Sequence, residues 1–400
     1  MYCFVTLFLQ LLLLILSNVW VPLVSHRSPV TLASPGAVTG ASQVVRSGQR
    51  RIPVTTVLLD VCGKGGLCVQ EALFYEKGDG GRTFCRLCPR LCSIRDGHTG
   101  FCRVRKNQQG ILYTLNYGRV SSYALDPIEK KPLYHFYPGS DILSLGSVGC
   151  NLRCGFCQNW QIAHADPHTL YLSPAQAVAA AREQIARGYP NVGLAYTYNE
   201  PFMWYEYVYD TARLAHQEGL KNVLVTNGYV NEEPLRQILP YIDAMNIDVK
   251  GFTDEYYRGT CAGHLEPVLR AVEIAHGHCH VELTTLLVPG LNDSEEEIRR
   301  LVDWVAGLDP DIPLHFSRYF PNYKFDLPPT PLETLQKAWQ IALEKLRYVY
   351  IGNAPELGGS DTLCPACGET LIRRTGYRVQ VRGLEGNRCR YCGAEVKVVV

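Results

Sequence analysis

Short apolar segments alternate with segments of helical period from residue 142 to residue 318. One expected helix begins with the capping box Ser173-Pro-Ala-Gln176, and another with Asp293 as N-cap and Glu296 at the third position. The strands that we expect are 142–147, 192–195, 222–225, 244–249, 281–287 and 314–318. Six such βα units predict an α/β fold with a parallel sheet, whose functional residues gather at the carboxyl edge. Spacing alone leaves a partial barrel and an open doubly wound sheet as alternatives.

Three cysteines follow the first expected strand, at the spacing CxxxCxxC: Cys150, Cys154 and Cys157. A [4Fe–4S] cluster usually takes four thiolates, so a loop that supplies three leaves one iron open to a small molecule. The alternatives are a zinc knuckle, which needs a fourth Cys or His nearby, and three unrelated buried cysteines. The position directly after a buried strand favours the cluster.

The chain has sixteen cysteines, most of them in close clusters, which indicates metal chemistry in a reducing compartment rather than a disulfide framework. One set precedes the expected sheet and comprises Cys85, Cys88, Cys92 and Cys102. Four soft ligands within eighteen residues suit one metal site. Structural zinc is our first expectation, an auxiliary iron–sulfur cluster the second, and four unliganded thiols the third.

A further set of cysteines follows the Gly-Gly-Ser segment at 358–360. Two CxxC-Gly knuckles lie about twenty residues apart, formed by Cys364, Cys367, Cys389 and Cys392. This is the spacing of a zinc ribbon, and mononuclear iron is the alternative because it takes the same ligands. We expect the metal to supply folding energy to a small module.

Polar residues follow the next expected strands, at the point where each strand ends. Asn199 and Glu200 follow the second strand, Asn227 the third, and Asp248 and Lys250 the fourth. Each alone is an ordinary strand-end turn. Together, at one edge of a parallel sheet, they predict a binding site beside the cysteine loop.

Other polar groups are expected to be structural. His276, His278 and His280 lie between a helix and the start of a strand, so we expect a surface cluster rather than a metal site. The charged segment at 126–131 is interpreted as a solvated turn, and Cys261 as a lone thiol.

The N-terminus is apolar from residue 4 to residue 24, and no Lys or Arg precedes this run. A membrane anchor, an export signal and an upstream extension are the open interpretations, and we favour an extension over residues 1–70. Balanced charge, net +1, gives no nucleic-acid footprint. We therefore expect a cytoplasmic metalloprotein, with membrane anchoring left open.

The cysteine loop, with Phe156 before its third cysteine, resembles the radical S-adenosylmethionine (SAM) superfamily. The resemblance implies a partial (β/α)6 barrel, a [4Fe–4S] cluster whose open iron is chelated by SAM, and Phe156 beside the adenine. Thr197-Tyr-Asn-Glu200-Pro201 stands where that family has Gly-Gly-Glu-Pro, whose carboxylate accepts the SAM ammonium. This role passes to Glu200, with Asn199 as neighbour. Tyr198 and Asn199 replace the two glycines, so the backbone part of that contact is in question.

Asp248-Val-Lys250 resembles the Asp-x-Lys motif that reaches SAM in glycyl-radical activating enzymes. Asn227, at the end of the third expected strand, is a further candidate SAM contact. These motifs imply reductive cleavage of SAM to a 5′-deoxyadenosyl radical, which abstracts hydrogen from an unknown, macromolecular substrate. The alternatives are a glycyl-radical activase and, in another class, a non-catalytic metal-binding adaptor.

Residues 71–355 resemble, more narrowly, the radical SAM member of the AmmeMemoRadiSam system, a group related to pyruvate formate-lyase activating enzymes. The resemblance implies AMMECR1-type and Memo-type partners and a reductant such as flavodoxin or ferredoxin. The expected division is an extension at 1–70, a Cys-rich segment at 71–135, a radical SAM core at 136–357 and a zinc-ribbon-like module at 361–400.

Overall fold

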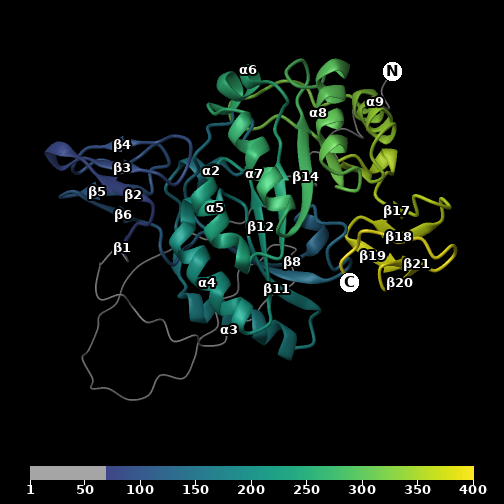
Figure 1. The fold of residues 1–400 in the computed structure, drawn as a ribbon, viewed down its shortest axis with the longest axis horizontal. Helices are drawn as coiled ribbons and strands as arrows, with labels where there is room; N and C mark the ends of the chain where they lie inside the picture. Colours follow the sequence, from purple (N-terminus) through teal and green to yellow (C-terminus); the bar gives the residue numbers. More distant parts are fainter. Residues whose placement is uncertain (1–68) are drawn as a thin grey trace, which may run out of the picture. The chain divides into compact units, whose positions relative to one another are not determined.

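The computed structural model describes residues 69–400, and its main sheet has eight strands in the order β16-β15-β14-β13-β12-β11-β9-β8 (Figure 1). Neighbours from β9 to β16 pair in parallel, and β8 is antiparallel to β9. The strands are β8 (Ser122–Pro127), β9 (Asp141–Gly146), β11 (Asn191–Tyr196), β12 (Lys221–Thr226), β13 (Ala244–Asp248), β14 (His280–Leu287), β15 (Leu314–Arg318) and β16 (Val349–Gly352). The six expected strands are confirmed, and β16 adds a further parallel strand.

The helices that connect these strands are α2 (Trp160–His164), α3 (Pro174–Ala186), α4 (Tyr205–Gln217), α5 (Glu232–Ile238), α6 (Asp254–Tyr256), α7 (Glu266–His276), α8 (Glu295–Leu308) and α9 (Leu332–Leu343). The capping box at the start of α3 is confirmed, since Ser173 accepts from the Gln176 N–H and Gln176 reaches back. The expected N-cap of α8 is wrong. Ser294 caps this helix, and Asp293 instead accepts from the Gly290 N–H.

The parallel strands follow one another in chain order without a reversal. A doubly wound sheet reverses its strand order at a switch point, so that alternative is not observed. Because parallel crossovers are right-handed, an unreversed order places the helices on one face of the sheet. In α4 the buried positions include Val208, Thr211, Ala212 and Ala215, the stripe that a helix presents to a core.

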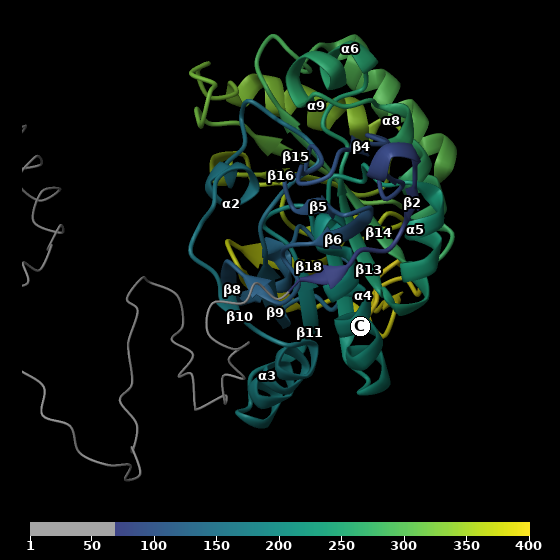
Figure 2. The ribbon, with the colours of Figure 1, turned by 90° about the vertical axis from the view of Figure 1, so that its left-hand side faces the viewer.

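The Cys-rich segment folds into small antiparallel sheets, seen from their own side in Figure 2. One has the order β1-β6-β5 and another β2-β3-β4, while β7 pairs with β10. Their strands are β1 (Gln70–Glu71), β2 (Tyr75–Lys77), β3 (Thr83–Cys85), β4 (Ser93–Ile94), β5 (Arg105–Gln108), β6 (Ile111–Thr114), β7 (Arg119–Val120) and β10 (Leu170–Tyr171). Such short sheets are not stable alone, and Leu87, Ile94 and Leu112 of this segment belong to the same buried apolar cluster as the main sheet.

The C-terminal knuckles lie among β17 (Thr362–Leu363), β18 (Thr370–Thr375), β19 (Arg378–Val381), β20 (Leu384–Glu385) and β21 (Arg388–Cys389). Leu371 and Ile372 of β18 share one buried apolar cluster with Tyr348 and Tyr350. Since Tyr350 belongs to β16, this module packs on the end of the main sheet rather than standing apart from it.

The apolar N-terminal extension lies outside the described residues, apart from its last two positions. Within residues 69–400, every helix is too short or too polar to cross a membrane.

Candidate active site

A cavity of about 560 Å³ opens at the carboxyl edge of the main sheet. Its volume lies in the range of small-molecule and cofactor sites. The predicted site residues that line it come from the ends of successive strands and are Cys150, Cys154, Phe156, Cys157, Asn199, Glu200, Asn227, Asp248 and Lys250. The structure therefore brings together residues that are up to 100 positions apart in the chain.

The cysteine loop leaves β9 through a backbone turn that only glycine makes easily. Gly149 has φ 94°, and a Cβ there would lie 2.8 Å from Val104 and 3.0 Å from the Cys102 carbonyl oxygen. The loop is then fixed from the other side, since the Arg153 N–H donates to the Cys261 carbonyl at 2.8 Å. The loop is thus held by two segments distant in the sequence.

The surroundings of the three loop thiols raise their pKa values. Burial raises the pKa of Cys157 to about 11 and that of Cys150 further. A hydrogen bond with the Cys261 thiol, together with burial, raises the pKa of Cys154 well above its usual value. Cys261, expected to be a lone thiol, therefore adjoins the loop. Three thiols at one cavity, of which Cys154 is buried and Cys150 and Cys157 are half-buried, are soft donors that metal binding deprotonates, so they fit a metal cluster.

Two asparagines attach the loop to the neighbouring strand ends. Asn199 accepts from the Ser147 N–H at 2.9 Å and donates to the Gly149 carbonyl at 2.9 Å. Asn227 donates to the Cys150 sulfur at 3.7 Å, a contact that stabilises a thiolate. Because both Asn199 contacts go to backbone, its side chain orients the loop.

Glu200 is a buried carboxylate at the cavity wall, with 2% of its surface exposed. It accepts from the Phe202 N–H at 3.0 Å, the Thr226 hydroxyl at 2.7 Å and the Asn227 N–H at 2.8 Å. A carboxylate has about four acceptor positions, so one remains for a ligand. Burial raises the pKa of Glu200 to about 7, although these hydrogen bonds oppose the shift.

Across the cavity, the Lys250 ammonium lies 3.0 Å from an Asp248 carboxylate oxygen. Phe156 packs edge-on against Phe325, with ring centroids 6.0 Å apart. An apolar ring, a buried carboxylate and an ion pair around one cavity match the three parts of a zwitterionic nucleoside ligand: its base, its ammonium and its carboxylate.

Tyr198 stands at one of the two glycine positions and has a backbone conformation that glycine adopts most easily. Its φ is 71°, in the left-handed region that costs a residue with a Cβ about 1–2 kcal/mol. The conformation is held because Asn159 donates to the Tyr198 carbonyl at 2.8 Å and the Tyr198 hydroxyl donates to Asp126. The departure from the family pattern therefore changes the side chain and keeps the glycine-like backbone.

The interpretation of segment 126–131 as a solvated turn is wrong. Asp126 lies in β8 and is 3% exposed, and Lys131 is 1% exposed and pairs with it at 2.7 Å. Lys130 also pairs with Asp126, and both lysines line the cavity. Lys130 is exposed, whereas the burial of Asp126 and Lys131 depends on the pairing of β8 with β9, which no local sequence pattern predicts.

The C-terminal cysteines form a tight group. The sulfurs of Cys364 and Cys392 are 3.6 Å apart, and those of Cys367 and Cys389 are 3.7 Å apart. Thiolates about 2.3 Å from a tetrahedral zinc ion lie about 4 Å from one another. The group is therefore compatible with the predicted zinc site.

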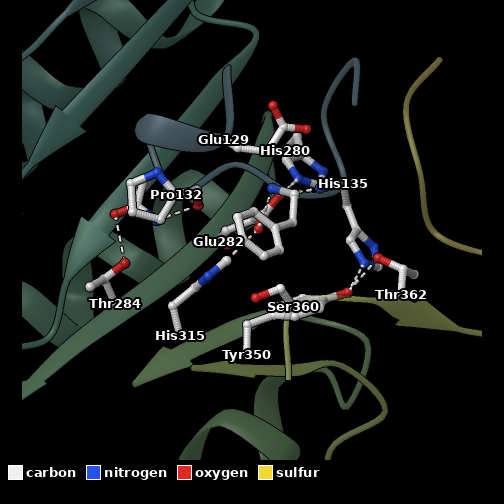
Figure 3. Close-up of polar contacts among 12 residues, drawn as sticks. Glu129, Pro132, His135, His280, Glu282, Thr284, His315, Tyr350, Ser360 and Thr362 are labelled. Atoms are coloured by element: carbon white, nitrogen blue, oxygen red, sulfur yellow. Dashed lines mark hydrogen bonds and ion pairs between the residues drawn. The ribbon is translucent and has the colours of Figure 1, made fainter. Parts of the chain in front are cut away.

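Near the amino ends of β14 and β15, a buried polar network centres on Glu282 (Figure 3). Glu282 accepts from His280 at 2.9 Å and from His315 at 2.7 Å. The expected surface cluster is thus wrong for His280, which serves this network. His135 joins the network through its N–H and through Tyr350, so it lies away from the cavity.

One family model and several known proteins are similar to this chain. A model of the radical SAM superfamily matches residues 145–304. An uncharacterized protein of Methanocaldococcus jannaschii is 44% identical over 341 residues, which are 83% of this chain and 100% of that protein. The pyruvate formate-lyase-activating enzyme of Clostridium pasteurianum is 25% identical over 170 residues, 40% of this chain and 67% of that enzyme. A solved domain of a pyruvate-formate lyase-activating enzyme from Bacteroides vulgatus aligns with a TM-score of 0.36 at 20% identity, over 40% of this chain and 99% of that one.

Proposed function

Because this chain belongs to the radical SAM superfamily and is a radical SAM enzyme, we propose that its carboxyl-edge cavity binds a [4Fe–4S] cluster and SAM to attack a macromolecular substrate. Cys150, Cys154 and Cys157 hold the cluster, which leaves one iron for the amino and carboxylate groups of SAM. When bound, the reduced cluster supplies the electron that cleaves SAM to methionine and a 5′-deoxyadenosyl radical, which abstracts a hydrogen atom.

The observation that carries this proposal is the single cavity that the three loop thiols share with Glu200, Asp248 and Lys250. Glu200 accepts a hydrogen bond from the iron-bound amino group of SAM at its remaining acceptor position. Lys250, with Asp248, neutralises and orients the carboxylate end, while Phe156 lies beside the adenine. Asn199 keeps the loop in place through the Gly149 carbonyl, and Asn227 donates to the Cys150 thiolate.

The test is anaerobic reconstitution with iron and sulfide, followed by dithionite and SAM. We expect 5′-deoxyadenosine and methionine in equal amounts from the native chain. A chain with a full cluster that releases neither product contradicts the proposal.

A second candidate is a glycyl-radical activase, favoured by the similarity to the activating enzyme of Clostridium pasteurianum. An activase also leaves an organic radical on a partner protein, which electron paramagnetic resonance (EPR) detects at g near 2. If 5′-deoxyadenosine forms and no organic radical appears on the partner protein, the first candidate function is favoured.

The remaining assignments belong to the same proposal. The unreversed strand order supports the partial (β/α)6 barrel. We retain the division into segments 71–135, 136–357 and 361–400, with zinc in the last, and a cytoplasmic location with flavodoxin or ferredoxin as reductant. Membership of the AmmeMemoRadiSam system rests on the sequence motifs. Co-purification of this chain with AMMECR1-type and Memo-type proteins tests it.

A further inference from the structure

The four cysteines that precede the main sheet line a second cavity of their own: Cys85, Cys88, Cys92 and Cys102. The Cys85 N–H donates to the Cys92 carbonyl at 3.0 Å, which closes the loop that carries three of them. Three of the four are buried, and Cys92 is half-buried. The space that they surround is about 10 Å³, close to what one water molecule needs.

This spacing is too open for zinc. Four thiolates drawn in to about 2.3 Å from one ion leave no room for a water molecule between them. Within residues 69–400, the C-terminal group is the only one with three or more metal-binding side chains whose ligand atoms all lie within 4.8 Å of one another. The Cys85 set shares its wider spacing with the Cys150 loop. A cubane needs such spacing, because its thiolates bind four separate irons.

Charge indicates that the second cavity takes an anionic centre rather than free thiols. Arg90 and Arg105 line it, and none of the described residues around it is acidic. The Nε of Arg105, in a side chain that is 1% exposed, has no hydrogen-bond partner, and neither has the buried Nη2 of Arg90. Glu206 pairs with another nitrogen of Arg105. Buried guanidinium groups with spare donors favour a thiolate-bound metal centre beside them.

We propose that Cys85, Cys88, Cys92 and Cys102 hold a second [4Fe–4S] cluster, ligated by all four thiolates, in place of the zinc expected from sequence. Because each iron then has a protein ligand, this cluster has no position for SAM. Its chemistry is electron transfer.

The second cavity abuts the first. Asn151 lines the second cavity, while its neighbours Cys150 and Leu152 line the first. Arg90 donates to the Asn151 carbonyl at 3.0 Å, and Cys102 lies against Gly149, as described above. Consecutive residues of the cysteine loop therefore line the two sites.

This adjacency gives the second cluster a role that rests on the proposed function. A reduced flavodoxin or ferredoxin gives it one electron, and it passes that electron to the cluster on Cys150, Cys154 and Cys157. The reductant is oxidised by one electron and the first cluster is reduced by one. No bond forms or breaks in the relay.

The first test is the metal content of the full chain after anaerobic reconstitution. Two cubanes and one zinc site predict about eight irons, eight sulfides and one zinc per chain. About four irons with two zincs overturns the proposal, and so does about four irons with one zinc. This measurement needs no variant, so it decides even if the variants below do not fold.

The second test uses EPR of the dithionite-reduced protein. We expect two cluster signals, of which SAM shifts one. The double variant Cys85→Ala/Cys88→Ala retains about four irons and the SAM-sensitive signal, while Cys279→Ala, a matched control outside all three sets, retains about eight irons. A double variant that keeps both signals overturns the proposal.

The relay has its own readout. In the double variant, SAM cleavage driven by reduced flavodoxin falls at least about tenfold, while cleavage driven by dithionite, which enters the open cavity directly, is retained. An unchanged flavodoxin-driven rate overturns the relay. Failure of SAM cleavage in a chain with both clusters contradicts the proposed function alone.

Discussion

At the amino edge of the main sheet, Glu282 accepts four hydrogen bonds, from the Tyr134 and His135 N–H groups and from His280 and His315. At the carboxyl edge, Glu200 accepts three and faces a cavity of about 560 Å³. Both carboxylates are buried. One has no acceptor position left and the other has one, so the amino edge is built for stability and the carboxyl edge for ligand binding.

The pKa directions of the two carboxylates follow the same contrast. Burial alone raises the pKa of a carboxyl group, as it does for Glu200, to about 7. At Glu282, burial also acts to raise the pKa, but hydrogen bonds from His280 and His315 hold it well below its usual value. Glu282 is thus an ionised group whose partners are His280 and His315, while Glu200 has one acceptor position open to a ligand.

The largest effect is expected from Cys154→Ala at the carboxyl edge. The variant loses a cluster ligand, so SAM cleavage falls by at least about a thousandfold, while the free energy of unfolding changes little. Cleavage is measured as 5′-deoxyadenosine released per chain. Cys279→Ala, which removes a thiol away from the cavity, should cleave SAM like the native chain. If Cys154→Ala cleaves SAM as fast as the native chain, Cys154 is not a cluster ligand.

At the amino edge, Glu282→Ala should destabilise the fold by about 3–5 kcal/mol, because it leaves His280 and His315 without their buried partner. SAM affinity of the folded fraction should not change. Since the pKa of Glu282 is lower in the folded chain than its usual 4.5, its stabilisation is present above that value and is lost as the pH falls. Denaturant titrations from pH 7 to pH 3 check both expectations. A variant as stable as the native chain contradicts the stabilising role assigned to Glu282.

Zinc removal should act at the amino edge alone. Cys367→Ala breaks the tight sulfur group and should reduce bound zinc from about one per chain to none. Because Tyr348 and Tyr350 share a core with this module, the melting temperature should fall by several degrees. Iron content should stay at the native value, and a parallel loss of iron contradicts the separation of the two centres.

The smallest effect is expected from Glu200→Gln, which should weaken SAM binding about tenfold, or 1.4 kcal/mol. The ionised carboxylate is the stronger acceptor for the amino group of SAM, so affinity in the native chain should rise as the pH increases through about 7. The Gln variant should lose this pH dependence. Calorimetric titration of SAM at pH 6, 7 and 8 measures the affinity and its pH dependence. A variant whose pH dependence equals that of the native chain excludes Glu200 as the acceptor for the amino group of SAM.

Sequence patterns predict the carboxyl edge better than the amino edge, and the reason is physical. Strand period, Cys150-x3-Cys154-x2-Cys157 spacing and strand-end residues are local signals, and a parallel sheet collects them at one edge. Three of the four donors to Glu282 are instead distant in the chain: His315 is 33 positions away, His135 147 and Tyr134 148, and only His280 lies close, two positions away.

The same reasoning explains the misinterpreted segment at 126–131. Asp126 and Lys131 are five residues apart and look like a solvated pair, yet β8 carries Asp126 to the edge of the main sheet. Spacing in the sequence also fails to separate zinc from a cubane at Cys85–Cys102, because the ligand types are the same. Only the distances between the sulfur atoms and the space among them distinguish the two.

The most direct measurement of the open iron is electron–nuclear double resonance on the reduced native chain with SAM labelled by ¹⁵N at its amino group. A cluster held by Cys150, Cys154 and Cys157 alone predicts a nitrogen hyperfine coupling that requires a bond to iron, absent from Cys154→Ala. A reduced cluster with saturating SAM and no such coupling would contradict the central claim.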